Sequence, residues 1–226
     1  NQGSSISLGK FLLILNPDTM FVDDCLSKIL IEADIKEKFG VIGPRLISKN
    51  GKIQQSYWRD PTIISTILSL FHLDYFNYNK NYKDEKFENT KIVDSISGGA
   101  FFLPREIFTK LKGLNENLFW MEDIDFCIRL REKGYKVYYS PSIKIIHFKG
   151  KSSEKNYRVA ISNQLISKIK FFRIHHSKLS AKIILAFILF VSLIKSFLIF
   201  FASPFSMSYR KKMFAYVYTI RCIFNS

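Results

Sequence analysis

The chain has 226 residues, 47% of them hydrophobic, which is enough for one domain with a core and an appendage. Its three cysteines, Cys25, Cys127 and Cys222, are far apart and form no CxxC pair, which argues against a disulfide framework and a zinc site and favours a reducing, cytoplasmic setting. The net charge of +15 belongs to the tail, because twelve of the 34 basic residues and no acidic residue follow Glu154, leaving 22 basic against 19 acidic residues before it.

The chain begins with Asn1, and its first ten residues are typical of the end of a helix that leads directly into a strand at Phe11. We therefore expect the sequence to be truncated at its N-terminus. No signal peptide is visible, although a truncated start would hide one.

Residues 11–18, FLLILNPD, form an apolar run closed by a proline and an acid. Such a run predicts the central strand of a parallel sheet that is covered on both faces. Ligands of open α/β sheets collect beyond the carboxyl ends of such strands, so Asp18 lies where a ligand is expected. The alternative is structural: Asn-Pro-Asp-Thr opens a turn, or Asp18 or Thr19 caps a helix over residues 21–33.

From Phe11 to about His147, short apolar segments alternate with amphipathic segments, which is typical of an α/β layer structure. Residues 39–48 predict a strand, Asn50-Gly51 a tight hairpin turn, and residues 52–58 the returning strand. Residues 62–73 predict a helix. The polar stretch 76–91 is expected to be a mobile surface excursion.

Residues 92–104, IVDSISGGAFFLP, predict a strand that is interrupted by Gly98 and Gly99. Glycines inside a strand indicate either a bulge or a place where another group approaches the backbone closely. Taken alone, these residues favour the bulge. Pro104 can start the following helix at its first turn.

Glu122, Asp123 and Asp125 begin a predicted helix that runs through Arg131 and stops at Gly134. Acids in a first helical turn can be purely structural, because the helix macrodipole stabilises each of them by about 0.3–1 kcal/mol.

That reading does not explain the aromatic side chains of Phe119 and Trp120 immediately before the acids. The next predicted strands, YKVYYSP and IKIIH, end at His147. A lone histidine there is compatible with an ordinary core or edge position.

The tail from Arg158 is expected to be helical, and residues 183–202 are apolar over about the length that spans a bilayer. Basic residues flank this run on both sides, and Lys195 lies inside it, so the positive-inside rule gives no orientation. At the helical period, polar side chains gather on one side: Lys178, Lys182, Ser192, Lys195, Ser196 and Ser203. We expect a helix in the membrane interface, with a pair of transmembrane helices or a buried core helix as alternatives.

Three segments, LLILNPDT, VIGPRLISKNGKIQQS and the stretch from SGGAFFLP to IKIIH, together resemble bacterial inverting glycosyltransferases of the GT-A fold. The closest resemblance is to the rhamnosyltransferase-like branch that builds surface polysaccharides, and it covers about residues 1–153. It implies an α/β chain: a partial GT-A fold with a mixed, mostly parallel sheet and a C-terminal helical, membrane-associated tail. We place the catalytic domain, without its N-terminal nucleotide-binding strands, at residues 1–157 and the tail at 158–226.

The resemblance implies that Asp18 holds Mg²⁺ or Mn²⁺ against the diphosphate of a nucleotide-sugar, within a triplet in which Asn16 replaces the first acid of the commoner Asp-x-Asp motif. One or two protein carboxylates are enough for such a cation, because water and phosphate oxygens complete its shell. His147 matches a histidine that reaches the metal or the diphosphate.

On the acceptor side, the resemblance makes Asp123 the base that takes the proton of the acceptor hydroxyl. Glu122 would position the acceptor or the helix start, and Asp125 would act as a cap or support. Gly98, Gly99 and Ala100 would lie beneath the acceptor sugar, and Trp120 could stack on it.

The expected partners are a nucleotide-sugar donor, a lipid-linked saccharide acceptor and an anionic membrane surface at the cytoplasmic face of the bacterial inner membrane. The tail would be peripheral there or would contribute one or two membrane helices. One rival is a catalytically inactive fragment that acts as a membrane-bound or partner-binding module. Nucleic-acid binding, suggested by a pI of about 9.7, is disfavoured because the basic residues alternate with long aliphatic runs.

Overall fold

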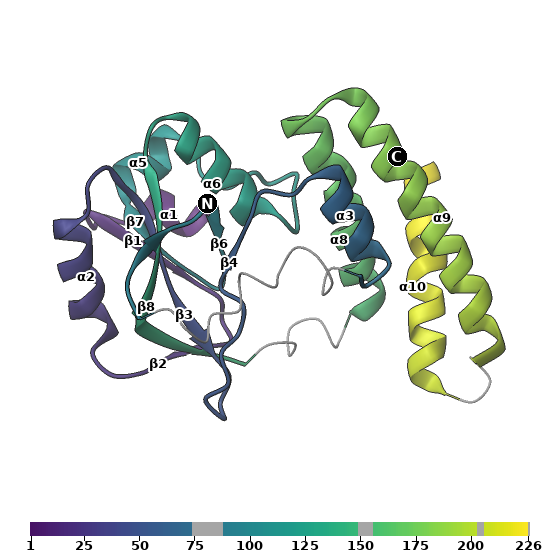
Figure 1. Ribbon diagram of the computed structural model, residues 1–226, viewed down its shortest axis with the longest axis horizontal. Coiled ribbons are helices and arrows are strands. Elements are labelled where there is room, and N and C mark those ends of the chain that lie inside the picture. Colours follow the sequence, from purple (N-terminus) through teal and green to yellow (C-terminus); the bar gives the residue numbers. More distant parts are fainter. Residues whose placement is uncertain (74–87, 149–155, 203–205, 226) are drawn as a thin grey trace. The chain divides into compact units, whose positions relative to one another are not determined.

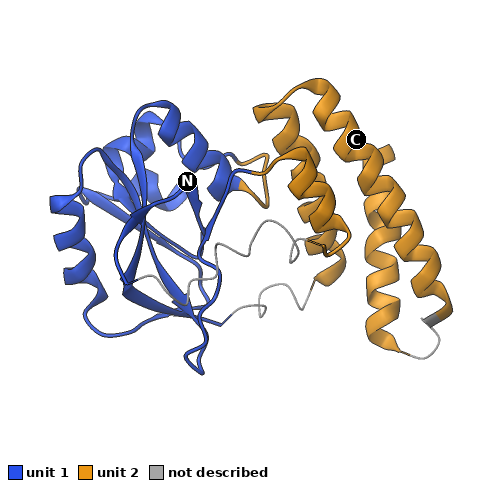
Figure 2. Cartoon of the chain, in the orientation of Figure 1, with its two compact units in different colours: residues 1–60, 81–115, 122–149 blue, residues 61–80, 116–121, 150–226 orange. Residues whose placement is uncertain are grey.

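The computed structural model describes residues 1–73, 88–148, 156–202 and 206–225. The chain divides into two compact units, shown in different colours in Figure 2. The first contains residues 1–60, 81–115 and 122–149, and the second contains residues 61–80, 116–121 and 150–226. The predicted surface excursion at 76–91 lies largely outside the described residues.

The first unit is built on a six-stranded sheet with the order β1-β7-β3-β8-β2, in which β5 also pairs with β8 (Figure 1). Its strands are β1 (Phe11–Leu15), β2 (Thr19–Phe21), β3 (Phe39–Ile47), β5 (Lys91–Ile92), β7 (Ala100–Pro104) and β8 (Lys136–His147). A separate two-stranded sheet joins β4 (Tyr57–Trp58) to β6 (Ser95–Ile96). The predicted α/β class with a mixed sheet is confirmed.

Strands β1, β3 and β8 run in the same direction and contain most of the sheet's residues, although β3 with β8 is the one parallel pairing within the described sheet. The expectation that residues 11–15 form a central strand is wrong for the described part of the chain, where β1 lies at the end of the strand order and pairs with β7. Its side chains nevertheless pack into the clusters on both faces of the sheet, which explains the apolar run.

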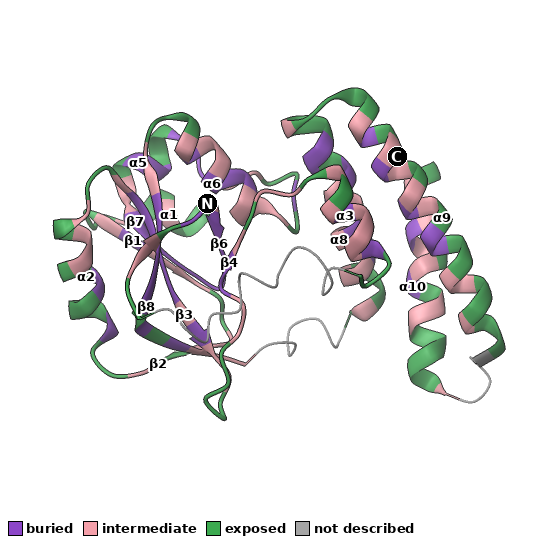
Figure 3. Cartoon of the chain, in the orientation of Figure 1, coloured by how far each residue is buried: buried purple, intermediate pink, exposed green. Residues whose placement is uncertain are grey.

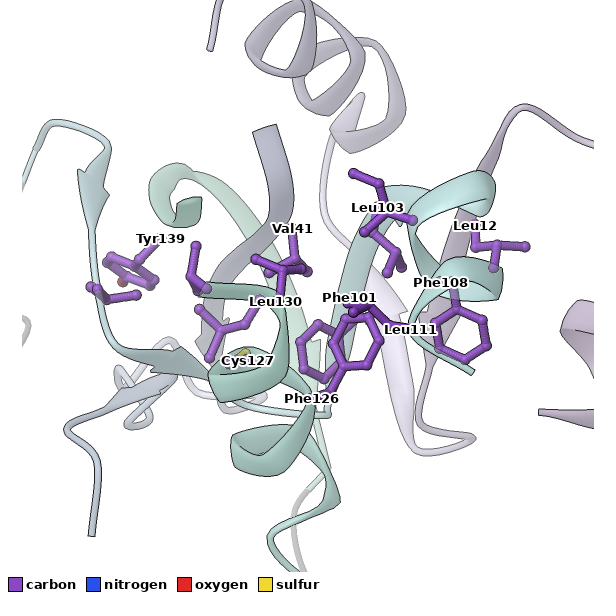
Figure 4. Close-up of a cluster of buried hydrophobic side chains, with 14 of the residues drawn as sticks. Leu12, Val41, Phe101, Leu103, Phe108, Leu111, Phe126, Cys127, Leu130 and Tyr139 are labelled. Atoms are coloured by element: carbon purple, nitrogen blue, oxygen red, sulfur yellow. The ribbon is translucent and has the colours of Figure 1, made fainter. Parts of the chain in front are cut away.

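The two faces of the sheet form two hydrophobic clusters, because successive side chains of a strand point to opposite faces. In β7, Phe101 and Leu103 belong to one cluster, whereas Ala100 and Phe102 belong to the other. The first cluster, shown in Figure 4, is covered by the helices α5 (Arg105–Lys110) and α6 (Glu122–Glu132). The second is covered by α2 (Cys25–Ile35).

Helix α2 begins at Asp24, whose side chain accepts a hydrogen bond from the backbone N–H of Ser27. The alternative in which Asp18 or Thr19 caps this helix is therefore ruled out, because residues 17 and 18 form a turn and residues 19–21 form β2. A carboxylate near a turn can be assigned to a cap only when the helix start is known, and Asp24 is the better-placed acid. Asp18 is thus free of a capping role.

The predicted hairpin at Asn50-Gly51 is confirmed: Ser48 N–H donates to the carbonyl of Lys52 at 2.8 Å, and Gly51 has a φ of +77°. The returning strand soon leaves β3, and β4 pairs with β6. Gly98 and Gly99 connect β6 to β7 and are not a bulge within one strand. Pro104 is the N-cap of α5, one position earlier than expected. A short helix, α1 (Gln2–Ile6), precedes β1, as the sequence suggested.

The second unit is helical and contains α3 (Ile63–Leu70), α8 (Tyr157–His175), α9 (Lys178–Ala202) and α10 (Met207–Phe224). Helix α3 begins at a capping box, in which the side chains of Thr62 and Ser65 bond to each other's backbone N–H. One helix of the described chain, over Lys178–Phe201, is long and apolar enough to cross a membrane.

The polar side chains of α9 form the outward face that the sequence suggested only at Lys178 and Lys182, which are exposed. Ser192 is buried, and the ammonium group of Lys195 donates to the carbonyl of Leu70 at the end of α3. Ser203 lies outside the described residues. Figure 3 shows exposed positions along α9 in green. Most of its exposed side chains are apolar: Leu179, Phe190, Leu193, Ile194, Phe197, Leu198, Phe200 and Phe201. Only 22% of the apolar segment is buried, so the alternative in which α9 is a buried core helix is wrong.

Candidate active site

Asp18 and His147 are brought together by the antiparallel pairing of β2 with β8. Thr19 lies opposite His147, and the N–H of Phe148 donates to the carbonyl of Asp18 at 2.8 Å. This register places Asp18 Oδ1 at 3.3 Å from His147 Nε2, and the two side chains are 15% and 14% exposed. Asp18 Oδ1 is buried and has no hydrogen-bond partner among the described residues.

The chemistry of these two side chains is compatible with a divalent cation, and they also form an ion pair when His147 is protonated. A buried carboxylate oxygen that accepts no hydrogen bond loses its hydration without compensation, unless another positive group satisfies it. The described residues contain no group of three or more His, Cys, Asp or Glu that could hold a metal by themselves. A site of two protein ligands suits a cation that keeps water and phosphate oxygens in its shell.

The turn at Gly98 and Gly99 connects the end of β1 to the start of α6. The backbone N–H of Asn16 donates to the carbonyl of Gly99 at 3.1 Å, and the N–H of Gly98 donates to Asp123 Oδ2 at 2.9 Å. The loop that carries Asp18 and the acid at the helix start are therefore fixed to the same two residues. The side chain of Asn16 is exposed.

The three small residues at this turn, Gly98, Gly99 and Ala100, have different surroundings. A Cβ on Gly99 would lie 2.9 Å from Leu46 Cδ1, whereas a Cβ on Gly98 would lie 3.4 Å from Asp123 Cβ. A side chain at residue 99 would thus crowd Leu46 of β3, whereas a methyl group at residue 98 would meet Asp123 at ordinary van der Waals distance. Ala100 is buried in the cluster beneath α2, so its methyl group faces the core and not a bound sugar.

Asp123 is held by two backbone donors, since Ile124 N–H also donates to its Oδ1 at 2.8 Å. Burial raises the pKa of Asp123, although the hydrogen bonds from Gly98 and Ile124 oppose the shift. Burial, followed by the neighbouring charge of Asp123, raises the pKa of Glu122 to about 7. Glu122 Oε2 is buried without a hydrogen-bond partner in the described structure.

The arginines of α6 are engaged elsewhere and do not neutralise Asp123. Arg131 pairs with Asp60, and Arg129 pairs with the buried Asp125 at 2.7 Å. Arg129 also donates to the carbonyls of Leu111 and Gly113, so this pair ties α6 to the loop after α5. The pairing agrees with the supporting role expected for Asp125, and it leaves Asp123 without an ion pair in the described part of the chain.

Trp120 belongs to the second unit, where its N–H and that of Phe119 both donate to Ser167 Oγ of α8. Both aromatic side chains are exposed. Stacking of Trp120 on an acceptor sugar stays a prediction.

Sequence reasoning missed Gln54, which contacts His147 with both ends of its amide group. Gln54 Nε2 donates to the carbonyl of His147 at 2.8 Å, and Gln54 Oε1 lies 3.1 Å from His147 Nδ1. The available signal was the hairpin at Gly51, which returns the chain beside the end of β3, but it does not indicate which distant side chain Gln54 meets.

Comparison with known proteins supports the resemblance. The chain is 24% identical over 151 residues to an N-acetylglucosaminyl-diphospho-decaprenol L-rhamnosyltransferase of Mycobacterium tuberculosis, covering 65% of this chain and 49% of the relative. It is 28% identical over 141 residues to the rhamnosyltransferase WbbL of Escherichia coli, covering 61% of this chain and 52% of the relative. The chain thus spans about half the length of the curated relatives it matches.

Among solved structures, the mannosyltransferase PcManGT of Pyrobaculum calidifontis, in complex with GDP-Man and Mn²⁺, is similar over 96% of this chain and 63% of that one, with 12% identity and a TM-score of 0.47. The family model for glycosyl transferase family group 2 matches residues 11–225, which is nearly the whole chain. The chain therefore belongs to glycosyl transferase family group 2.

Proposed function

We propose that the protein transfers a rhamnose-like sugar from a nucleoside-diphosphate donor to a lipid-linked saccharide, with inversion and with the help of a divalent cation. The observation that carries this proposal is the arrangement around Gly98 and Gly99. That turn is bonded both to Asp123 and to the end of β1, which leads into Asp18. The sugar and the type of acceptor follow from the activities of the two rhamnosyltransferase relatives.

Asp123 is the candidate base. Its two carboxylate oxygens each accept one backbone N–H, which fixes the group while leaving lone pairs for an acceptor hydroxyl. A raised pKa makes the carboxylate a better proton acceptor than an ordinary aspartate. In the proposed step the acceptor oxygen forms a bond to the anomeric carbon, its proton passes to Asp123, and the bond to the donor phosphate breaks with its electron pair leaving on the nucleoside diphosphate.

Glu122 supports the same step from the adjacent position. Its pKa of about 7 means that a substantial fraction is protonated at neutral pH, so it can donate a hydrogen bond to an acceptor oxygen. A neutral Glu122 also avoids a second negative charge beside Asp123.

Asp18 and His147 would hold the cation through Oδ1 and Nε2. A bound Mg²⁺ or Mn²⁺ supplies positive charge against the leaving diphosphate. The exposed backbone around Asn16 would border the same phosphates.

The second unit supports association with a membrane. The exposed side chains of α9 are largely aliphatic and aromatic, and the whole tail is basic and lacks acidic residues. Such a combination suits the acyl-chain boundary of an anionic membrane, where a lipid-linked acceptor resides. We propose the cytoplasmic face of the inner membrane as the site of action.

The test is the Asp123→Asn variant, which keeps the shape of the side chain and one of its two backbone hydrogen bonds, because the amide oxygen still accepts, but removes its basicity. The purified chain, in vesicles that contain decaprenyl-diphosphate-linked N-acetylglucosamine, is incubated with radiolabelled nucleoside-diphosphate rhamnose and Mn²⁺. We expect transfer to fall by at least about 10²-fold, the lower limit for loss of a general base. The exposed Asp34→Asn change in α2 is the matched control.

Circular dichroism of each variant checks that the fold is intact. A folded Asp123→Asn variant with wild-type turnover would remove Asp123 from the mechanism. Absence of turnover in the wild-type chain, with donor binding also absent by calorimetry, would favour the inactive membrane-bound module instead.

A further inference from the structure

The backbone of Gln54 is fixed at the end of β3. Its N–H donates to the carbonyl of Leu46 at 2.8 Å, and its carbonyl accepts from Ser56 Oγ at 2.9 Å. The Ser56 hydroxyl oxygen in turn accepts the N–H of Leu46 at 2.8 Å. Gln54 is therefore presented to His147 from a rigid, doubly bonded position.

The two amide contacts of Gln54 determine the proton position on His147. The carbonyl oxygen of His147 can only accept, so the amide nitrogen of Gln54 must face it. The amide oxygen of Gln54 then faces His147 Nδ1, and because this oxygen also only accepts, Nδ1 must carry the proton. In a neutral imidazole, Nε2 is then left with its lone pair free.

We propose that Gln54 is a positioning residue that holds His147 as its Nδ1–H tautomer, so that the Nε2 lone pair and Asp18 Oδ1 face one divalent cation. This inference rests on the proposed function of Asp18 and His147. Residues that donate to or accept from the second nitrogen of a metal-binding histidine fix both its tautomer and its ring orientation. Gln54 would do both, because it bonds to the ring and to the main chain of the same residue.

The spacing of the two ligand atoms agrees with this role. Ligands at right angles around an octahedral cation, each about 2.1 Å from it, are about 3.0 Å apart. Asp18 Oδ1 and His147 Nε2 are 3.3 Å apart, and Oδ1 receives no hydrogen bond from a described residue. In the proposed tautomer the facing acceptors are His147 Nε2 and Asp18 Oδ1, which a cation would bridge, whereas the opposite neutral tautomer would leave Gln54 Oε1 facing a bare Nδ1.

The first measurement uses the wild-type chain in detergent without metal. Long-range ¹H–¹⁵N spectra of ¹⁵N-histidine-labelled protein, recorded at about pH 8.5, well above the ordinary histidine pKa of about 6.5, report the tautomer of each ring. Comparison with His147→Gln assigns the signal. We expect the Nδ1–H pattern at His147, and an Nε2–H pattern would overturn the inference without any variant of Gln54.

The second measurement compares Gln54→Met with Gln55→Met, using Mn²⁺ alone as the probe and electron paramagnetic resonance to count free metal. Gln55 is the adjacent glutamine, and its amide group bonds to the carbonyl of Tyr57. We expect Gln54→Met to lose the pure Nδ1–H pattern and to weaken Mn²⁺ binding about tenfold or more, whereas Gln55→Met changes neither. Gln54→Glu loses the donor to the carbonyl of His147 but keeps an acceptor facing Nδ1, so it should keep the Nδ1–H pattern.

Asp18→Asn distinguishes failure of the proposed metal site from failure of the proposed role of Gln54. If Asp18→Asn leaves Mn²⁺ binding unchanged, the metal site of the proposed function fails. If Asp18→Asn weakens binding while folded Gln54→Met keeps both the affinity and the tautomer, the role of Gln54 alone fails.

Discussion

The raised pKa of Glu122 predicts a specific dependence of stability on pH. Burial, with the charge of Asp123 second, raises this pKa from 4.5 to about 7 in the folded protein. Between these values the folded state binds more protons than the unfolded state, so stability falls as pH rises from about 4.5 to 7. At 1.36 kcal/mol per pKa unit, the loss has an upper limit of about 3 kcal/mol.

The variant Glu122→Gln removes this titration, because an amide group does not ionise in this range. It still buries a polar group without a hydrogen-bond partner, so its absolute stability is not the readout. The readout is the change in the free energy of unfolding with pH. Between pH 5 and pH 8, we expect the free energy of unfolding of the variant to rise relative to that of the wild-type protein by up to about 3 kcal/mol. Asp123 contributes a slope of the same sign that remains in both proteins, since its pKa is also raised.

The assay is urea unfolding in detergent, followed by the fluorescence of Trp58 in a Trp120→Phe background, because Trp58 lies in the first unit and Trp120 in the second. Glu132→Gln is the control, since Glu132 is an exposed glutamate of the same helix. The reasoning is refuted if the wild-type stability is flat between pH 5 and pH 8, or if Glu122→Gln has the wild-type slope.

Two further substitutions test the scaffold of the site, both by urea unfolding with exposed Asp34→Asn as the shared control. Gly99→Ala should destabilise the protein by about 1–3 kcal/mol, because the new Cβ would lie 2.9 Å from Leu46 Cδ1; unchanged stability would mean that β3 relaxes freely. Asp125→Asn should cost about 3 kcal/mol, because it leaves the largely buried Arg129 guanidinium without its carboxylate partner, and a loss below about 1 kcal/mol would contradict that account.

Local pattern was enough to predict most elements and several site residues. The apolar run before Asn16, the Asn-Gly turn and the helix from Glu122 are all confirmed, because each depends on periodicity or turn chemistry within a few residues. Acids at a strand end and a helix start could be identified in the same way. The catalytic and metal roles of Asp123 and Asp18 stay predictions.

The sequence-based expectations fail where contacts with residues distant in sequence decide the local structure. The alternative in which Asp18 caps a helix fails, because the pairing of β2 with β8 makes residues 19–21 a strand and Asp24 caps α2. Lys195 was expected on an outward polar face, but its ammonium group bonds to the carbonyl of Leu70, 125 residues earlier. Helical period indicates which side chains share a face, but not what that face meets.

By itself the sequence determined the α/β class, the basic apolar tail and the presence of acids where strands and helices end, because these follow from hydrophobic period and charge along one segment. Only the tertiary structure joined the Gly98-Gly99 turn to both Asn16 and Asp123, and Gln54 to His147, 93 residues away. The physical reason is that a hydrogen bond requires two groups within about 3 Å, and strand register, which depends on the packing of the whole sheet, decides which distant groups reach that distance.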